Sequence, residues 1–235
     1  MAGAARGAGV ATNLLATTAL FGSLPEPALG QVAEATTQRR YRKGEFVFHQ
    51  GDRGDRLFIV ADGAVQVAVT SPEGQEVILA TLRRPDVFGE LTAIDGGTRS
   101  ATVRTTVDTT LLSIRRDTLL ALLRTQPSVA DVLLRSLGDI VRRLSGQAAD
   151  FVFLDLPARV AKLLVGLAEE HGTADERGVT LALDVTQSTL AAMVGGSRQS
   201  VNQALQALEQ EGSIVRDART VVIGDVDVLR RRAGA

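Results

Sequence analysis

The sequence predicts an α+β protein in which one long helix joins a β-rich N-terminal domain to a C-terminal winged helix-turn-helix. Three observations support this fold class. Between residues 39 and 114, short runs of Val, Ile, Phe and Leu alternate with turns that contain Gly, Pro and Asp, as in a β sandwich or barrel. Residues 128–154 lack proline and repeat apolar residues at helical spacing. Residues 186–208 carry the caps and the glycine turn of two crossed helices.

The N-terminal end of the chain carries few structural signals. Its first residues, MAGAARGAGVATN, are mostly small and lack the apolar core of a signal peptide. We therefore expect a poorly ordered tail over residues 1–16 and a folded domain that starts at residue 17. Residues 26–36 then read as a short helix with three apolar residues on one face.

Composition excludes several kinds of chemistry. The 235 residues include no cysteine and two histidines, His49 and His171. Disulfides, thiolate catalysis, cysteine-held clusters and a histidine-rich metal site are therefore not expected. The sequence also offers no nucleophile–base pair and no Walker-type loop, so we expect neither an enzyme nor an obligatory cofactor.

Bulk charge gives no sign of a nucleic-acid partner. The net charge is −1, and from residue 155 onward nine Lys and Arg stand against eleven Asp and Glu. A DNA-binding role must therefore rest on a motif and on the local placement of charge. No apolar run is long enough to cross a membrane, so the sequence predicts a cytoplasmic protein with no membrane partner.

The most informative stretch is VFGELTAIDGGTRSATV, residues 87–103. It holds one carboxylate, Glu90, and one guanidinium, Arg99, on a short loop that turns at several glycines. Backbone N–H groups beside a Gly-rich turn, together with a fixed arginine, suit a phosphate group, and a nearby carboxylate can accept from a ribose hydroxyl. The alternative is a polar connection between two strands, with both charges on its surface.

Residues 128–154 form the expected long helix, and Pro127 sits where its first turn would start. At 1.5 Å per residue this helix would span on the order of 40 Å. Its apolar stripe is narrow and is flanked by charges, which favours a two-helix dimer seam over ordinary packing on the barrel. The expected seam, in which Gln147 would set the register, comprises Leu133, Leu137, Ile140, Leu144, Gln147 and Phe151.

Residues 186–208 read as a helix-turn-helix. Thr186 and Ser197 are good helix caps, and Gly195 makes the turn between the two helices. The second helix would enter a major groove with its N-terminus first. A hairpin over residues 214–223 forms a wing in which Arg216 and Arg219 are candidates for phosphate contacts. The alternative is a helical hairpin that only packs. The residues expected to be exposed on the second helix are Arg198, Gln199, Ser200, Asn202 and Gln203.

FGEL at residues 88–91, followed by RSA at residues 99–101, resembles the phosphate-binding cassette of the Crp/Fnr transcription regulators. The resemblance runs from about residue 21 to the C-terminus. It implies a cyclic-nucleotide-binding jelly-roll domain in which Glu90 takes the ribose 2′-hydroxyl, while Arg99 and Ser100 take the cyclic phosphate. The neighbouring cassette residues Gly89 and Leu91 complete that part of the candidate site.

The long helix resembles the dimerisation helix of the same family, which also closes the nucleotide pocket. The family's adjacent Thr and Ser, which meet the base, align with Leu144 and Ser145. The serine is kept, but leucine replaces the threonine, which leaves the identity of the base open. The resemblance implies a sensor domain over residues 17–126, a dimerisation helix with its hinge over 127–155, and a winged helix-turn-helix over 156–235.

SRQSVNQAL, residues 197–205, resembles the recognition helix of Crp-like regulators. Arg198 matches the arginine that reads guanine, whereas Gln199 replaces the usual glutamate and suits adenine better than cytosine. Gln203 also departs from the family pattern, so the half-site should differ from the usual one. The DNA-binding candidates are Ser197, Arg198, Gln199, Ser200, Gln203 and Arg219.

These features predict a homodimeric transcription regulator controlled by a cyclic nucleotide, cAMP or a relative. Its expected partners are palindromic double-stranded DNA, a second copy of the chain and, as a further candidate, RNA polymerase. One alternative is a DNA-binding regulator that needs no ligand because Leu144 fills the base pocket. Another is a nucleotide-binding adaptor that works through protein partners, although the intact helix-turn-helix and wing argue against it.

Overall fold

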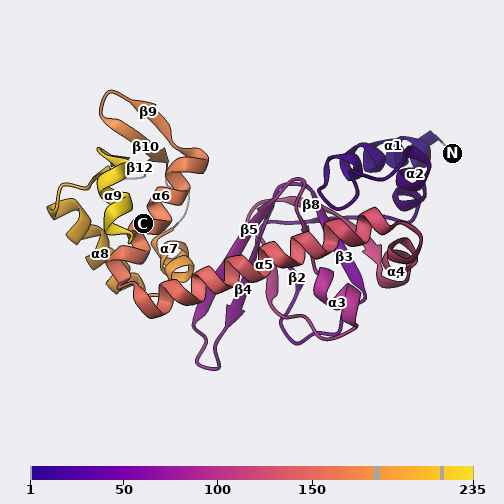
Figure 1. Cartoon of the computed structure of the whole chain (residues 1–235), viewed down its shortest axis with the longest axis horizontal. Coiled ribbons are helices and arrows are strands. Elements are labelled where there is room, and N and C mark those ends of the chain that lie inside the picture. Colours follow the sequence, from indigo (N-terminus) through magenta and orange to yellow (C-terminus); the bar gives the residue numbers. More distant parts are fainter. Residues whose placement is uncertain (1, 183–185, 218–219, 235) are drawn as a thin grey trace. The chain divides into compact units, whose positions relative to one another are not determined.

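The computed structural model describes residues 2–182, 186–217 and 220–234 (Figure 1). The chain forms two compact units. One comprises residues 1–71 and 79–140, and the other comprises residues 72–78 and 141–235. The first unit holds the β-rich domain, and the second holds the helix-turn-helix.

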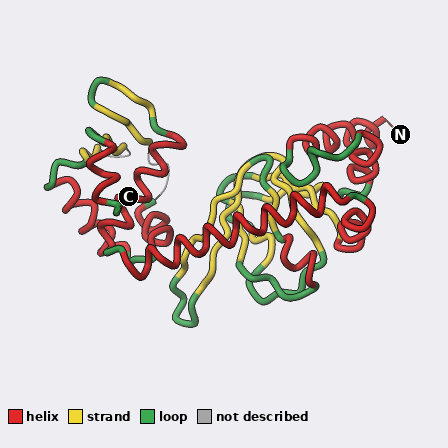
Figure 2. Tube along the Cα trace, in the orientation of Figure 1, coloured by secondary structure: helices red, strands yellow, loops and turns green. Residues whose placement is uncertain are grey.

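Two four-stranded sheets form the β-rich domain (Figure 2). Their strand orders are β1-β8-β3-β6 and β2-β7-β4-β5, and the pairs β1–β8, β3–β8 and β4–β7 are antiparallel. Two facing antiparallel sheets agree with the jelly-roll architecture expected from the sequence. The strands are β1 (Thr37–Tyr41), β2 (Phe46–Phe48), β3 (Arg56–Asp62), β4 (Ala64–Thr70), β5 (Glu76–Arg83), β6 (Val87–Phe88), β7 (Thr102–Thr105) and β8 (Thr109–Arg115).

Strand β3 of the first sheet is buried on both faces, which explains its uninterrupted apolar run Leu57–Phe58–Ile59–Val60. Phe58 and Val60 belong to the cluster between the two sheets. Leu57 and Ile59 point to the opposite face, where they join a cluster covered by helices. Successive side chains of a strand alternate between faces, so a strand covered on both sides needs apolar residues at every position.

Helices α1 (Ala2–Thr17) and α2 (Glu26–Glu34) pack together on this outer cluster (Figure 1). For residues 11–16 the structure therefore differs from the expected poorly ordered tail. Ala11, Leu14 and Leu15 recur at helical spacing and are almost fully buried. Burial of these side chains against the domain supplies the stabilisation that the small residues before them lack.

Helix α4 (Arg116–Thr125) leads into α5 (Pro127–Phe153), and α5 agrees with the long helix predicted over residues 128–154. Pro127 occupies the first position of α5, where its missing N–H costs nothing. Helix α5 runs without a break from the first compact unit into the second. Its N-terminal part is anchored because Val129 and Leu133 are buried in the cluster shared with α1, α2 and α4.

The apolar stripe that α5 leaves exposed differs from the predicted seam. Leu133 is 5% exposed, whereas Leu134 and Val141 are 67% and 62% exposed. The predicted seam counted Leu133 as available to a second helix, but its own domain buries it. The stripe left open, with alternating spacings of three and four, therefore consists of Leu134, Leu137, Val141, Leu144, Ala148 and Phe151. Leu137 is half-buried and the others are exposed, and Ile140 and Gln147 lie beside the stripe.

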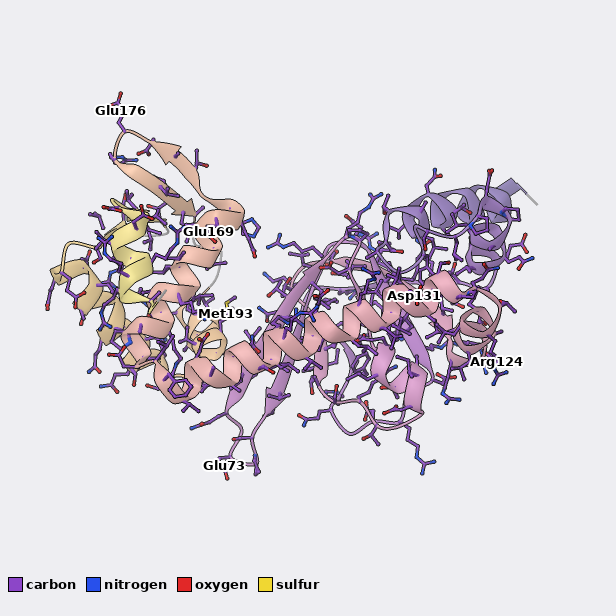
Figure 3. The ribbon with its side chains drawn as sticks, in the orientation of Figure 1. Glu73, Arg124, Asp131, Glu169, Glu176 and Met193 are labelled. Carbon is purple, nitrogen blue, oxygen red and sulfur yellow. The ribbon has the colours of Figure 1, made fainter. Side chains whose placement is uncertain are left out.

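The C-terminal unit is a winged helix-turn-helix built around one cluster of buried residues. Its helices are α6 (Leu156–His171), α7 (Gln187–Val194), α8 (Arg198–Gln210) and α9 (Val226–Arg232). Its sheet has the order β11-β12-β10-β9, and Glu176 extends from the turn between β9 and β10 (Figure 3). Helix α9 and strand β9 were not predicted. The strands are β9 (Thr173–Asp175), β10 (Gly178–Ala182), β11 (Ile214–Asp217) and β12 (Thr220–Ile223).

The junction between α5 and α6 is short. Helix α5 ends at Phe153 and α6 begins at Leu156. Asp155 caps α6, since its side chain accepts from the backbone N–H of Ala158 at 2.8 Å. Hydrogen bonds from Ala158 and Arg232 lower the pKa of Asp155 below its ordinary value. The helical structure is interrupted at residues 154 and 155, before the Leu–Pro step, and the hinge expected in this region stays a prediction.

Candidate ligand and DNA-binding sites

The loop that carries FGEL begins with a left-handed residue. Gly89 has φ = 78° and precedes α3 (Glu90–Asp95), which ends at Gly96 with φ = 74°. An L side chain rarely adopts such a φ value, so glycine suits both ends of this single short turn. The chain then bends tightly, because the N–H of Gly97 donates to Oδ1 of Asp95 at 2.7 Å. This geometry returns the chain towards β7 and places Arg99 beside the start of α3.

Two backbone hydrogen bonds fix the position of Arg99. Its N–H donates to the carbonyl of Asp52 at 2.8 Å, and its own carbonyl accepts from Gly51 at the same distance. The loop before β3 and the loop after α3 are thereby joined, and a bridge between Arg53 and Thr98 extends the pairing. Residues about 45 positions apart in sequence are thus brought together, and these two loops with Arg99 between them are called the cradle below.

The Arg99 side chain turns inward and is 5% exposed. Its terminal nitrogens donate to the carbonyls of Gly89 at 3.1 Å and Arg56 at 2.9 Å. The guanidinium carbon lies 4.1 Å from the ring centre of Phe48 and 5.5 Å from that of Phe58. A cation over desolvated aromatic rings gains about 2 kcal/mol, so this pocket stabilises a charge that burial would otherwise disfavour.

Burial and nearby carboxylates act on the charge of Arg99 in opposite directions. Burial lowers the pKa of Arg99 from its ordinary value, although the carboxylates of Asp55, Glu90 and Asp52 favour the charged form. An arginine nonetheless stays protonated at neutral pH. Its Nε is buried and has no hydrogen-bond partner among the described residues. A buried donor without a partner costs about 1–3 kcal/mol, and an anionic oxygen would remove that cost.

Two glycines leave room for this guanidinium. A Cβ on Gly89 would lie 2.7 Å from Nη1 of Arg99. A Cβ on Gly54 would overlap Nε and the guanidinium carbon, although the backbone of Gly54 is not left-handed. Sequence reasoning identified Gly89 but missed Gly54, because nothing in the sequence pairs residue 54 with residue 99.

Five predicted nucleotide-binding residues meet in this cradle. Gly89, Glu90 and Leu91 start α3, and Ser100 follows Arg99 with an exposed side chain. Leu91 is also exposed, at 39%, and Glu90 is half-buried.

The two remaining candidates, Leu144 and Ser145, lie on α5 in the second compact unit and are exposed there. Their part in a nucleotide pocket stays a prediction.

The DNA-reading candidates lie at the start of α8, after a tight turn. Thr186 caps α7 by accepting from Thr189 at 3.1 Å. Gly195 ends that helix with φ = 64°, where an added Cβ would also overlap the ring of Phe151. Ser197 then caps α8 by accepting from the backbone of Ser200 at 3.0 Å. The predicted caps and turn are confirmed.

Exposed polar side chains follow that cap. Arg198, Gln199 and Gln203 are all exposed, and the Nε of Arg198 donates to Gln187 on α7 at 3.3 Å. Ser200 is half-buried, and its hydroxyl lies 2.8 Å from that of Ser197. The predicted Arg219 lies outside the described residues. The described candidates therefore form one polar surface on the first turns of α8.

Arg216 does not stand free for a phosphate contact, contrary to the sequence-based expectation. Its Nη2 forms an ion pair with Oε2 of Glu209 at 2.7 Å, and its Nη1 donates to Asn202 at 3.2 Å. These bonds tie the wing strand β11 to the recognition helix α8. The tie brings together residues up to 14 positions apart in sequence, which explains why periodicity could not reveal it.

Comparison with known proteins agrees with both halves of this description. Residues 38–126 match the family "Cyclic nucleotide-binding domain", and residues 158–232 match the "Crp-like helix-turn-helix domain". The CRP-like cAMP-activated global transcriptional regulator of Mycobacterium tuberculosis is 34% identical over 221 residues, covering 94% of this chain and 99% of that protein. The chain belongs to the Crp/Fnr family of transcription regulators.

Further Crp/Fnr relatives include the cyclic AMP receptor protein of Thermus thermophilus, 34% identical over 83% of this chain and 88% of that protein. The solved structure of a CooA mutant from Carboxydothermus hydrogenoformans has a TM-score of 0.73 at 25% identity, covering 85% of this chain and 88% of its own. The Thermus thermophilus catabolite activator protein has a TM-score of 0.54 at 31% identity, covering 92% and 99%. These relatives confirm the fold class and the family predicted from the sequence.

Members of the Crp/Fnr family regulate transcription and are not enzymes, which confirms that prediction. Within residues 2–182, 186–217 and 220–234, no group of three or more His, Cys, Asp or Glu side chains could hold a metal ion. No helix in the described part of the chain is both long and apolar enough to span a bilayer.

Proposed function

We propose that this protein is a homodimeric, DNA-binding transcription regulator whose affinity for an operator is controlled by a cyclic nucleotide bound at Arg99. One observation carries the proposal: a buried arginine with an unpartnered Nε lies in a glycine-lined cradle. A cyclic phosphate supplies the acceptors that this guanidinium lacks. Glu90 would take the ribose hydroxyl, and Ser100 would complete the phosphate contacts.

We propose cAMP or a close relative as the effector. The relatives from Mycobacterium tuberculosis and Thermus thermophilus are named as cAMP-activated and as a cyclic AMP receptor. In this chain Leu144 stands where a hydroxyl would meet the base, so contacts to the sugar and phosphate carry most of the affinity. We therefore expect weaker discrimination between adenine and guanine than a hydroxyl at that position would give.

The exposed apolar stripe on α5 supports a homodimer. Val141 and Leu134 are more than 60% exposed, and a soluble helix seldom leaves such residues unpaired. Their spacing alternates between three and four residues together with Leu137 and Leu144, which is the pattern of a two-helix seam. A second copy of α5 would cover this stripe and would bring two recognition helices to a palindromic site.

DNA recognition is assigned to the surface formed by Ser197, Arg198, Gln199, Ser200 and Gln203, together with the sequence-predicted Arg219. Arg198 would read a guanine, and the two glutamines would favour adenine contacts. Nucleotide binding would change the equilibrium between two arrangements of the reading helices through the junction at Asp155. RNA polymerase is the expected downstream partner. We expect the protein to act in the cytoplasm, where operator DNA is found.

The decisive experiment is isothermal titration of the full-length protein with cAMP, cGMP and a cyclic dinucleotide. We expect binding of one of them at micromolar or tighter affinity, and no measurable heat for Arg99→Ala, which removes the guanidinium. Circular dichroism should show that the variant stays folded.

Wild-type affinity in Arg99→Ala would refute the cradle as the binding site. No heat with any nucleotide, in a protein that still binds DNA, would instead favour a ligand-independent regulator. In that case Leu144→Thr should create nucleotide binding if Leu144 fills the base pocket.

A further inference from the structure

Arg216 forms a bridge between the wing and the recognition helix. On one side its Nε and Nη2 donate to Oε2 of Glu209 at 3.0 and 2.7 Å, and its backbone N–H donates to Oε1 at 3.2 Å. On the other side its Nη1 donates to Oδ1 of Asn202 at 3.2 Å. Three nitrogens of Arg216 thus hold one carboxylate, and a fourth holds one amide.

This bridge determines which way the Asn202 amide faces. A guanidinium can only donate hydrogen bonds, so the oxygen of the amide must be the atom that faces Arg216. The Nδ2 group is therefore directed elsewhere, and it donates to no described residue. Asn202 is half-exposed, so this amide offers two hydrogen-bond donors and no free acceptor on the side away from Arg216.

Asn202 lies beside the DNA-reading surface. It follows Arg198 by four residues, about one helical turn, and therefore projects from the same side of α8. The buried side of α8 is formed by Val201, Ala204 and Leu205. Asn202 thus occupies the flank of the helix between the reading surface and the wing, where DNA held by both would pass.

The charge of Arg216 is already compensated. Hydrogen bonds from Arg216 lower the pKa of Glu209 below its ordinary value, so the carboxylate is ionised at neutral pH. A guanidinium paired with this carboxylate adds little to the attraction of DNA phosphates. Its contribution is therefore geometric, because it holds one amide in one orientation.

We propose that Asn202 contacts operator DNA as an oriented hydrogen-bond donor, and that Arg216 and Glu209 are its positioning residues. This inference rests on the proposed function. The ligand is an acceptor on the DNA, either a phosphate oxygen at the edge of the groove or a base acceptor such as purine N7, guanine O6 or thymine O4. The exocyclic amino groups of adenine and cytosine are excluded because they are donors.

The test starts from an operator selected in vitro with the wild-type protein, with any effector found by titration present. Affinity for this operator and for unrelated DNA is then measured by fluorescence anisotropy. We expect Asn202→Ala to weaken operator binding by about tenfold or more. A base acceptor would leave binding to unrelated DNA within about twofold of wild type, whereas a phosphate acceptor would weaken both to a similar degree. Asn202→Asp keeps an acceptor for Arg216 but removes both donors, and it should weaken operator binding further than Asn202→Ala does. Gln210→Glu makes the same change of charge at an exposed position of α8 and is the control.

Arg216→Met should weaken operator binding as much as Asn202→Ala does. The double variant should lose no more operator affinity than either single variant, because both changes remove the same contact. Arg216→Lys, which keeps a donor, should recover part of the affinity. The dependence of binding on salt should stay unchanged in Arg216→Met, as expected for a residue that contacts no phosphate.

Operator analogues identify the acceptor. If a single methylphosphonate substitution removes the difference in operator affinity between wild type and Asn202→Ala, the acceptor is a phosphate oxygen. If one base-pair change removes that difference, the acceptor is a base. Operator binding by Asn202→Ala within about twofold of wild type, or fully additive losses in the double variant, would overturn the inference. Failure of the wild-type protein to select any operator would instead refute the proposed function.

Discussion

At the scale of single residues, the shape of the candidate ligand site depends on the space around one buried cation. The guanidinium of Arg99 lies against the rings of Phe48 and Phe58 and is limited on another side by Gly54 and Gly89. Side chains in such a close-packed site have one favourable position. A single added methyl group should therefore affect binding even at a residue that would not touch the nucleotide.

Gly54→Ala tests this dependence. The new methyl group would overlap the Arg99 guanidinium, while the backbone of Gly54 is compatible with alanine. We expect nucleotide affinity to fall about tenfold or more, since a hydrogen bond to a charged group contributes about 1.5–3 kcal/mol. Titration calorimetry measures the effect. Gly30→Ala adds the same methyl group where nothing lies within 4 Å and should bind normally. Unchanged affinity in Gly54→Ala would show that the cradle tolerates a displaced guanidinium.

At the scale of elements, α5 has two different apolar sides. Val129 and Leu133 are buried by the chain's own sensor domain, and the stripe through Leu134, Val141 and Leu144 is left exposed. A heptad pattern alone cannot separate these uses, because both sides carry leucine, valine or isoleucine. The exposed stripe identifies the residues through which a second copy would pack.

A charge within this stripe should prevent dimerisation. Val141→Glu would bury an unpaired carboxylate from each copy, which costs several kcal/mol. We expect a monomer at micromolar concentrations by sedimentation equilibrium, with the helical content preserved. Ala149→Glu places the same charge on an exposed position outside the stripe and should leave the dimer intact. A dimer of normal stability in Val141→Glu would assign self-association to another surface.

The C-terminal unit should lose stability in acid. Hydrogen bonds to Arg216, Ala158 and Arg177 lower the pKa values of Glu209, Asp155 and Asp175, respectively. A carboxyl group whose pKa is lower in the folded state contributes stability above its unfolded pKa, and this is lost as the pH falls through the folded value. We therefore expect the loss to develop below about pH 4, the ordinary range of carboxyl groups.

Thermal unfolding of wild type and Glu209→Gln from pH 7 to pH 3 would reveal this contribution. The two proteins should differ most at pH 7 and should converge in acid, where Glu209 is protonated. A difference that stays constant over this range would show that ionisation of Glu209 does not stabilise the fold.

At the scale of the whole molecule, regulation requires that ligand and operator influence each other. Helix α5 belongs to both compact units, and the α5–α6 junction contains the Asp155 cap. One helix is thus shared by the two units, and its C-terminal end leads into a capped junction. Coupling between two binding sites must be reciprocal, whatever conformations carry it.

The reciprocity is measurable. If the nucleotide raises operator affinity by some factor, operator DNA must raise nucleotide affinity by the same factor, which is typically about 5- to 150-fold. Anisotropy titrations with and without the nucleotide measure one side, and calorimetry with and without operator DNA measures the other. Equal nucleotide affinity for the free and the DNA-bound protein would show that the two domains act independently.

Much of this organisation was predictable because its signals are local. Thr186, Gly195 and Ser197 determine the helix-turn-helix through caps and one left-handed turn, each of which involves only nearby backbone. Unbroken apolar runs such as residues 57–60 predicted strands, since a strand covered on both faces needs them. The FGEL and RSA motifs likewise lie close together in sequence, and they predicted the family.

Only the tertiary structure decided the features that depend on distant partners. It made α1 a packed helix, because Leu14 and Leu15 find a core that lies far along the chain. It shifted the exposed stripe of α5, because burial of Leu133 depends on the surrounding helices. It also paired Arg216 with Glu209 and Asn202, partners that the sequence pattern did not reveal. A sequence specifies which side chains can bury or pair, but competition among partners in three dimensions determines which of them do.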